Sequence, residues 1–144
     1  MKTPMTKLML AAFAAFSLCL GAKALEQDTD GYYMLGSVQD WRDFAALVET
    51  DMTLNAKMIA DIDLGDDQTM IGSYAHPYAG EFDGQGYTLT INYDTSSLVV
   101  DAGQDAATGG YGYFGAGPFR DINGATIRNL HTTGEIVADK IGAA

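Results

Sequence analysis

The spacing of apolar residues changes along the chain, and each change marks a different predicted element. Residues 38–48 place them three or four apart, which predicts an α-helix with an apolar face made of Val38, Trp41, Phe44, Ala45 and Val48. From residue 54 the period falls to two, which predicts a half-buried strand with inward side chains at Leu54, Ala56, Met58, Ala60, Ile62 and Leu64. Only Ile59 interrupts this alternation. Residues 87–93 alternate in the same way and predict the clearest strand of the chain.

The predicted helix has a start signal. Ser37 precedes the first helical residue and Asp40 follows three residues later, which resembles a capping box, although aspartate is a weaker partner there than glutamate. Residues 31–36 are typical of a short strand between two glycines. We expect Trp41 and Phe44 to have structural roles on the buried face, so that the helix acts as a cap in front of the β-structure.

A glycine-rich turn leads into the clearest strand. In the run Asp83-Gly84-Gln85-Gly86 we expect Gly84 and Gly86 to supply positive φ angles, with the Asp83 side chain hydrogen-bonded to its own backbone. The alternative for this run is a ligand-binding loop.

A bend is predicted near the last strands. Ile127 and Leu130 are three residues apart, so one regular strand cannot bury both of them. A bend at Arg128 and Asn129 would reverse the facing of the side chains, which gives Asn129 a structural role. Flat-sided coils joined by corners require such bends.

The first residues predict the compartment. Lys2 and Lys7 precede an apolar run over residues 8–20, and Ala22-Lys23-Ala24 supplies the small residues of a cleavage site. We therefore expect residues 1–24 to be a secretory signal peptide and the mature chain to be extracellular or at the cell surface. A membrane span is the alternative, but the run is shorter than the roughly 20 apolar residues that a bilayer needs. Cys19 would leave with the signal, which excludes disulfides and a catalytic thiol in the mature chain.

The net charge of the chain makes some classes of binding partner unfavourable. It carries 8 basic and 19 acidic residues, a net charge of −11, and the signal peptide holds Lys2, Lys7 and Lys23. The mature surface would therefore be even more acidic, which disfavours nucleic acid and anionic membranes as partners. An acidic surface favours solubility and the binding of divalent cations. The 144 residues suit one domain at most.

One stretch carries a family resemblance. It contains Ile62-Asp63-Leu64, Ile71-Gly72, the run Pro77-Tyr78-Ala79-Gly80-Glu81-Phe82-Asp83-Gly84-Gln85-Gly86-Tyr87-Thr88-Leu89, then Gly112-Tyr113-Phe114-Gly115 and Ala125-Thr126-Ile127-Arg128-Asn129-Leu130. This order resembles secreted bacterial β-helix proteins of the GLUG-repeat and pectate-lyase-like type, over roughly residues 54–136. Tyr113 replaces the leucine of the family's G-L-F-G element, and further G-L-x-G repeats are missing. The resemblance implies a mainly β fold, the start of a right-handed parallel β-helix with one N-terminal capping α-helix.

The resemblance also implies a division of the chain. After the signal peptide we expect a loose leader at residues 25–30, a strand and capping helix at 31–53, and the first β-helix coils at 54–144. Residues 94–110, rich in small and polar side chains, would be an inserted loop. We take Ile62, Ile91 and Ile127 as equivalent positions of successive coils. Stacked coils need several repeats and caps at both ends, so we expect the coils to continue beyond residue 144 in a longer protein.

Two groups of residues are candidate ligand contacts. Four carboxylates that fall close together in sequence, Asp61, Asp63, Asp66 and Asp67, suggest a calcium site. Their spacing matches no EF-hand loop, and the alternative is a solvated strand end. Exposed aromatic rings along a β-helix can stack on sugars, which suggests glycan contact by Tyr74, Tyr78, Tyr111 and Tyr113. The alternative is that these rings pack within or between coils.

Signals for catalysis are weak. His76 and His131 are the only histidines, and neither has the spacing of a zinc site or a nucleophile–base pair. We name no catalytic residue and no cofactor other than calcium. Three hypotheses remain: a non-catalytic exported surface module for adhesion or contact with a glycan or host component, the front of a β-helix polysaccharide lyase, hydrolase or peptidase with its active site beyond residue 144, and a calcium-stabilised spacer.

Overall fold

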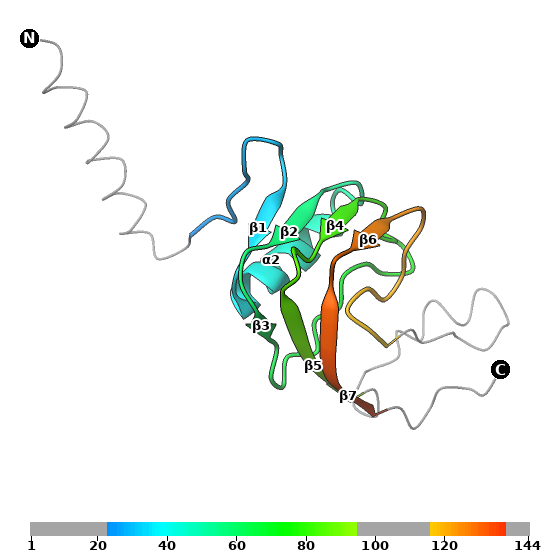
Figure 1. Ribbon diagram of the computed structural model, residues 1–144. Helices are drawn as coiled ribbons and strands as arrows, with labels where there is room; N and C mark the ends of the chain where they lie inside the picture. The colour runs from blue at the N-terminus through cyan, green and yellow to red at the C-terminus, as the bar shows by residue number, and fades with distance from the viewer. Residues whose placement is uncertain (1–22, 95–115, 138–144) are drawn as a thin grey trace, which may run out of the picture.

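The computed structural model describes residues 23–94 and 116–137 (Figure 1). These residues form one helix and seven short strands, in the order β1 (Tyr33–Leu35), α2 (Val38–Val48), β2 (Ala56–Met58), β3 (Ile62–Asp63), β4 (Glu81–Asp83), β5 (Thr88–Asp94), β6 (Thr126–Arg128) and β7 (His131–Val137). The prediction of a mainly β chain with one helix near its front is confirmed. In the part of the chain described, no helix is both long and apolar enough to cross a membrane.

The strands form two parallel sheets, and neither sheet is closed. One sheet has the order β1-β2-β4-β6 and the other has the order β3-β5-β7. From β2 onward, successive strands therefore belong alternately to the first and to the second sheet. We call the strand pairs β2 and β3, β4 and β5, and β6 and β7 three successive passes of the chain. Each strand of one pass lies beside the corresponding strand of the pass before it (Figure 1). The segment before β4 and the segment before β6 also run parallel to each other. Two isolated parallel bridges, Ile71 with Phe119 and Tyr78 with Ile122, join them.

The strand register corrects two predictions. Ile127 pairs with Phe82, and Ile62 pairs with Leu89, so Ile62, Ile91 and Ile127 are not equivalent positions. The alternating run at residues 54–64 is two strands rather than one. β2 ends at Met58 and β3 begins at Ile62, and the chain changes sheet between them.

The turns that lead from the first sheet to the second are short and contain residues with positive φ angles. The predicted bend is confirmed, because β6 ends at Arg128, β7 begins at His131, and Asn129 between them has a φ of +53°. The corresponding corner between β4 and β5 has Gln85 at +54° and Gly86 at +80°. Residues with left-handed backbones thus turn the chain at both corners, and the two corners are in contact.

Helix α2 follows its predicted pattern. The Ser37 hydroxyl accepts a hydrogen bond from Asp40 N at 3.1 Å, and Asp40 Oδ2 accepts one from Gly36 N at 2.9 Å. Both side chains therefore satisfy amides at the start of the helix, as a capping box does. The buried helical residues are Trp41, Phe44, Ala45 and Val48, all of them on the predicted apolar face.

Aromatic rings from distant segments form the core beneath the helix. Trp41 lies edge-on to Phe82 and to Phe119, each with ring centroids 5.9 Å apart. Phe44 lies edge-on to Tyr78 at 6.0 Å. Edge-on ring contacts add to the stabilisation that comes from burying large rings. They therefore hold the helix against β4 and against the segments that precede β4 and β6.

Residues 25–30 correct the prediction of a loose leader. Gln27 forms an antiparallel bridge with Tyr33, and Met34 N donates to Glu26 O at 2.9 Å. Asp28 forms an ion pair with Lys57 of β2 at 2.5 Å. The leader therefore lies along the outer edge of β1. The inserted loop predicted at 94–110 lies outside the described residues, apart from Asp94 at the end of β5.

Candidate functional site

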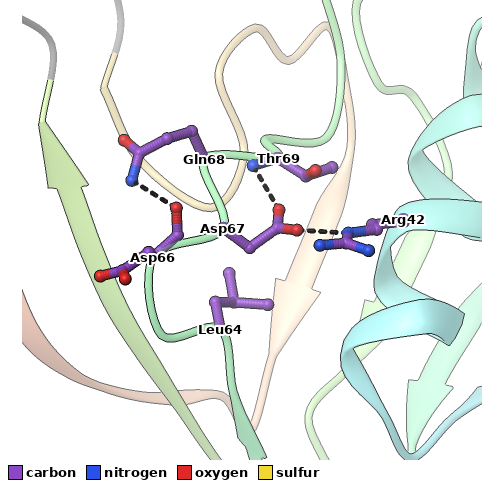
Figure 2. A pocket seen from close by; sticks show the side chains of 6 residues that line it. All are labelled: Arg42, Leu64, Asp66, Asp67, Gln68 and Thr69. Atoms are coloured by element: carbon purple, nitrogen blue, oxygen red, sulfur yellow. Dashed lines mark hydrogen bonds and ion pairs between the residues drawn. The ribbon is translucent and has the colours of Figure 1, made fainter. Parts of the chain in front are cut away.

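The loop after β3 borders a solvent-open hollow. It encloses about 600 Å³ and is lined by Arg42, Leu64, Asp66, Asp67, Gln68 and Thr69 (Figure 2). We call it the loop hollow. It is open to solvent, and its lining side chains come from the helix on one side and from the loop on the other (Figure 2). A second hollow of about 390 Å³, the strand hollow, is lined by Asp66, Gln68, Asn92, Tyr93, Asp94, Glu135 and Val137. Asp66 and Gln68 line both hollows.

Asp67 fixes one side of the loop hollow. Its carboxylate accepts a hydrogen bond from Thr69 N at 2.8 Å and forms an ion pair with Arg42 on the helix (Figure 2). Partial burial would raise the pKa of Asp67, but the hydrogen bonds from Thr69 and Arg42 outweigh this effect and the pKa lies below its ordinary value. Asp67 is therefore a charged, already occupied group that joins the loop to the helix.

The Thr69 carbonyl connects this loop to the core. It accepts hydrogen bonds from Trp41 Nε1 and from the Tyr93 hydroxyl, both at 3.0 Å. Each ring is buried, so each polar atom needs a partner inside the protein. One carbonyl serves both, which places the loop in a single position against the helix and β5.

The side-chain amide of Gln68 hydrogen-bonds to β5 in the way that the backbone of a neighbouring strand would. Its Nε2 donates to Asn92 O at 2.8 Å, and its Oε1 accepts from Asp94 N at 2.8 Å. These are the main-chain groups on either side of Tyr93 that a neighbouring parallel strand would use. The side-chain amide thus extends the pairing of the short strand β3 along the longer strand β5.

The four aspartates of the possible calcium site have separate roles. Asp61 Oδ1 accepts from Thr88 N at 2.8 Å, and Asp63 Oδ1 accepts from Gly65 N at 2.9 Å. Asp67 pairs with Arg42, and Asp66 lies exposed between the two hollows. Within residues 23–94 and 116–137, no three histidine, cysteine or acidic side chains are grouped so that they could hold a metal ion. The structure does not bring the four carboxylates together.

The tyrosines expected to contact a glycan differ in exposure. Tyr74 is 65% exposed and its ring is accessible. Tyr78 is fully buried, and its hydroxyl donates to Leu54 O at 3.0 Å. Burial raises the pKa of Tyr78 and leaves no face for a sugar, so its assignment as a glycan contact was wrong and it is a core residue. Tyr111 and Tyr113 lie outside the described residues.

The two glycines of the predicted turn have different roles. Gly86 has the expected positive φ, but Gly84 does not, and Gln85 takes the second left-handed position. Gly84 is required for another reason, because a Cβ there would lie 2.5 Å from Asn129 O and from Leu130 Cα. Asp83 accepts from Gln85 N at 2.9 Å, which is the predicted bond to its own backbone.

A charged network on the first sheet was missed in the sequence. Arg128 Nη2 contacts Glu81 Oε1 at 2.7 Å and Asp83 Oδ2 at 3.0 Å. Lys57 is paired in register with Asp83, which is paired in register with Arg128, so alternating charges cross three neighbouring strands. Tyr32 also interacts with Glu81 and Arg128. The alternation in Ala56-Lys57-Met58 and Glu81-Phe82-Asp83 places these charges opposite the core, but only the register brings them together.

The chain was compared with protein-family models, with curated proteins and with solved structures, and none of the three comparisons finds a match.

Proposed function

We propose that this chain is the front of an exported right-handed parallel β-helix, a non-catalytic surface module that contacts a glycan or a host or cell-surface component. The observation that supports it best is the alternation of the strands between two parallel sheets. Successive passes add β2 and β3, then β4 and β5, then β6 and β7, each in register with the pass before. Stacked passes of this kind are the unit of a solenoid, and parallel connections in one sheet are nearly always right-handed.

The role of α2 in this proposal is that of a cap. Trp41 and Phe44 cover the aromatic interior at Phe82 and Tyr78, and the leader covers the outer edge of β1. Natural β-proteins cover sheet edges in this way to prevent unwanted pairing.

The loop hollow and the strand hollow are the surface that we propose for ligand contact. The groups that line them include the exposed carboxylate of Asp66 and the side-chain amide of Asn92. Carboxylate and amide groups can together accept and donate the hydrogen bonds of sugar hydroxyls. The acidic surface favours a neutral glycan over a uronate or sulfated chain, because like charges would repel.

A glycan-binding experiment tests this proposal. The full chain, in its exported form, is applied to an array of neutral and anionic oligosaccharides, and affinities are measured for any that bind. We expect retention of neutral glycans and at least a tenfold loss with Asp66→Ala. Asp30→Ala is the matched control, because Asp30 is an exposed carboxylate on the leader. Equal losses in the two variants, or no binding to any neutral glycan, would count against glycan contact.

Export is tested separately. We propose cleavage after Ala24, so N-terminal sequencing of protein from the medium or cell surface of an expressing bacterium should begin at Leu25. Protein that stays in the cytoplasm with Met1 intact would refute the signal-peptide prediction.

The charged network supports one alternative, the front of a β-helix lyase, hydrolase or peptidase. Enzymes on this fold collect acidic and basic side chains from several strands on one face, as Lys57, Glu81, Asp83 and Arg128 are collected here. The two carboxylates are, however, both paired with Arg128. A polysaccharide-degradation assay in which Glu81→Gln abolishes activity would favour the enzyme.

A further inference from the structure

The segment before β6 contains one residue more than the segment before β4 that runs beside it. Tyr78 is bridged to Ile122, and a few residues later Glu81 of β4 is paired with Thr126 of β6. Between these two pairings the segment before β4 has two residues, whereas the segment before β6 has three, residues 123–125. An extra residue opposite a shorter partner is a β-bulge, in which the extra residue is left unpaired.

The bulge determines the hydrogen bonding of Gly124. Just before this glycine, Asn123 N donates to Tyr78 O at 2.8 Å. Just after the bulge, Thr126 N donates to Gly80 O at 3.0 Å. Gly124 N, between these two fixed points, has no hydrogen-bond acceptor in the described part of the chain. Gly124 has a φ of +78°, and the position that a Cβ would occupy is surrounded by open space.

The residue before this amide carries a group with which the amide can react. Asn123 is exposed, and with Gly124 it forms the single Asn-Gly pair of the sequence. Glycine has no side chain to hinder its nitrogen, and a nucleophile held beside its target reacts as if it were highly concentrated. We propose that Asn123 is a site of spontaneous covalent modification, where the Gly124 nitrogen attacks the side-chain amide and the residue becomes aspartate or isoaspartate.

The reaction needs water as its only co-reactant. The Gly124 nitrogen loses its proton and bonds to Cγ of Asn123, and the bond from Cγ to Nδ2 breaks, which releases ammonia and closes a succinimide ring. Water then opens the ring at one of its two carbonyl carbons. Opening at Cγ gives aspartate. Opening at the main-chain carbon gives isoaspartate, in which the main chain is longer by one methylene. Either product adds a negative charge to the bulge.

A second pair in the chain shows what the bulge changes. In Asp30-Gly31, the glycine has a φ of +84° and open space around it, as Gly124 has, and both residues of the pair are exposed. Gly31 N, however, donates to Asp28 O at 3.2 Å. This nitrogen must give up a hydrogen bond before it can attack a neighbouring side chain. Asp30→Asn therefore creates an Asn-Gly pair that differs from the natural one in the hydrogen bond of its glycine.

Peptide mass spectrometry tests the site. The full chain carrying Asp30→Asn is incubated at mildly alkaline pH and digested with trypsin at intervals, and residues 121–128 should be released with Asn123 as their only asparagine. In the folded protein Asn123 should lose its amide about fivefold faster than the new asparagine, because one hydrogen bond holds the Gly31 amide. In urea neither amide is held, and the two rates should come close together. An Asn123 that keeps its amide, equal rates in the folded protein, or a ratio that urea leaves unchanged would overturn the proposal.

The products test the route. Ring closure gives both aspartate and isoaspartate, whereas direct hydrolysis of the side chain by water gives aspartate alone. A protease that cuts before aspartate does not cut before isoaspartate, so a peptide that this protease leaves uncut should accumulate. Asn123→Gln is the matched variant in the natural chain, because its longer side chain must close a larger ring, and it should keep its amide over the same period. Aspartate as the sole product, or equally fast loss from Asn123→Gln, would refute attack by the Gly124 nitrogen. The modification depends neither on export nor on glycan contact, so each proposal can fail without the other.

Discussion

Asn129 and Asp83 join two corners of the protein that are 46 residues apart in sequence. The Asn129 side-chain amide donates to Asp83 Oδ1 at 3.0 Å, and the Asn129 carbonyl accepts from Gly86 N at 2.9 Å. The Asp83 side chain is 5% exposed and also contacts Arg128. This pair therefore fixes the relative position of the turn after β4 and the turn after β6, and it fixes the register of both sheets beyond them.

The first prediction concerns this carboxylate. Burial would raise the pKa of Asp83, but hydrogen bonds from Asn129 and Gln85 and the charge of Arg128 outweigh it, so the pKa lies below its ordinary value of 3.8. Replacing Asp83 with Asn should lower the free energy of unfolding at pH 7 by about 1.5–3 kcal/mol, because a hydrogen-bonded charge is lost and an amide donor faces Asn129. Chemical denaturation of both proteins measures this difference.

The pH dependence supplies a check on the cause. A lowered folded-state pKa gives stability that is fully present above the unfolded pKa and is lost as the pH falls through the folded pKa. The difference between the natural chain and Asp83→Asn should therefore be constant above about pH 5 and should shrink at lower pH. A difference that stays the same at pH 3 would show that the charge of Asp83 is not the cause.

The second prediction separates the two turn glycines. Gly84→Ala should lower the free energy of unfolding by about 3 kcal/mol, because the new methyl group would collide with the backbone of Asn129 and Leu130. Gly86→Asn should cost less than about 1 kcal/mol, because asparagine tolerates a left-handed backbone and there is open space around this residue. Thermal denaturation compares the two variants. We also expect Gly84→Val to be more destabilising than Asp83→Ala, and the reverse order would argue against close stacking of the corners.

Local patterns in the sequence predicted the helix well. Its cap, buried face and position depend on residues within one or two turns of each other, such as Ser37 and Asp40, so the sequence contains the necessary information. The bend at Asn129 was also predictable, because it follows from two apolar residues only three positions apart.

Contacts between passes of the chain were not predictable in the same way. The alternation at residues 54–64 continues across the corner between β2 and β3, and only the exception at Ile59, which is 47% exposed, marks that corner. The pairing of Ile62 with Leu89 depends on how one pass stacks on the next, not on the local pattern. The loop hollow was missed for the same reason, because Gln68 owes its role to β5, 24 residues later.

The third prediction concerns the anchor of the helix. Trp41 is fully buried, so Trp41→Ala should lower the free energy of unfolding by about 3–5 kcal/mol through the cavity that it leaves. Trp41→Phe should cost less, because it keeps most of the ring packing and loses the bond to the Thr69 carbonyl, which retains the Tyr93 hydroxyl as a donor. Urea denaturation measures both variants. An unchanged midpoint for Trp41→Ala would mean that the indole does not support the core.

The fourth prediction concerns calcium. Because Asp61, Asp63 and Asp67 already accept backbone amides and Asp67 also pairs with Arg42, we expect no shared site among them. Melting curves recorded with millimolar calcium and with a chelator should therefore have the same midpoint. A midpoint several degrees higher with calcium would revive the spacer hypothesis, since a ligand that binds only the folded state stabilises it. Asp66→Asn would then show whether the exposed carboxylate beside the two hollows is a ligand.

The last prediction tests whether the Gln68 amide substitutes for a strand. Gln68→Glu keeps the shape and the acceptor for Asp94 N, but it replaces the donor to Asn92 O with a charged oxygen. An acceptor facing an acceptor should lower the free energy of unfolding by about 1–3 kcal/mol at pH 7. The loss should be smaller near pH 4, where the new carboxyl gains a proton and can donate again. Gln39→Glu is the matched control, because Gln39 is exposed on the helix and bonds only to Asp43 in the described structure. Amide hydrogen exchange at Asp94 reports the local effect. Equal losses at the two glutamines would show that the added charge, rather than the pairing with β5, destabilises the fold.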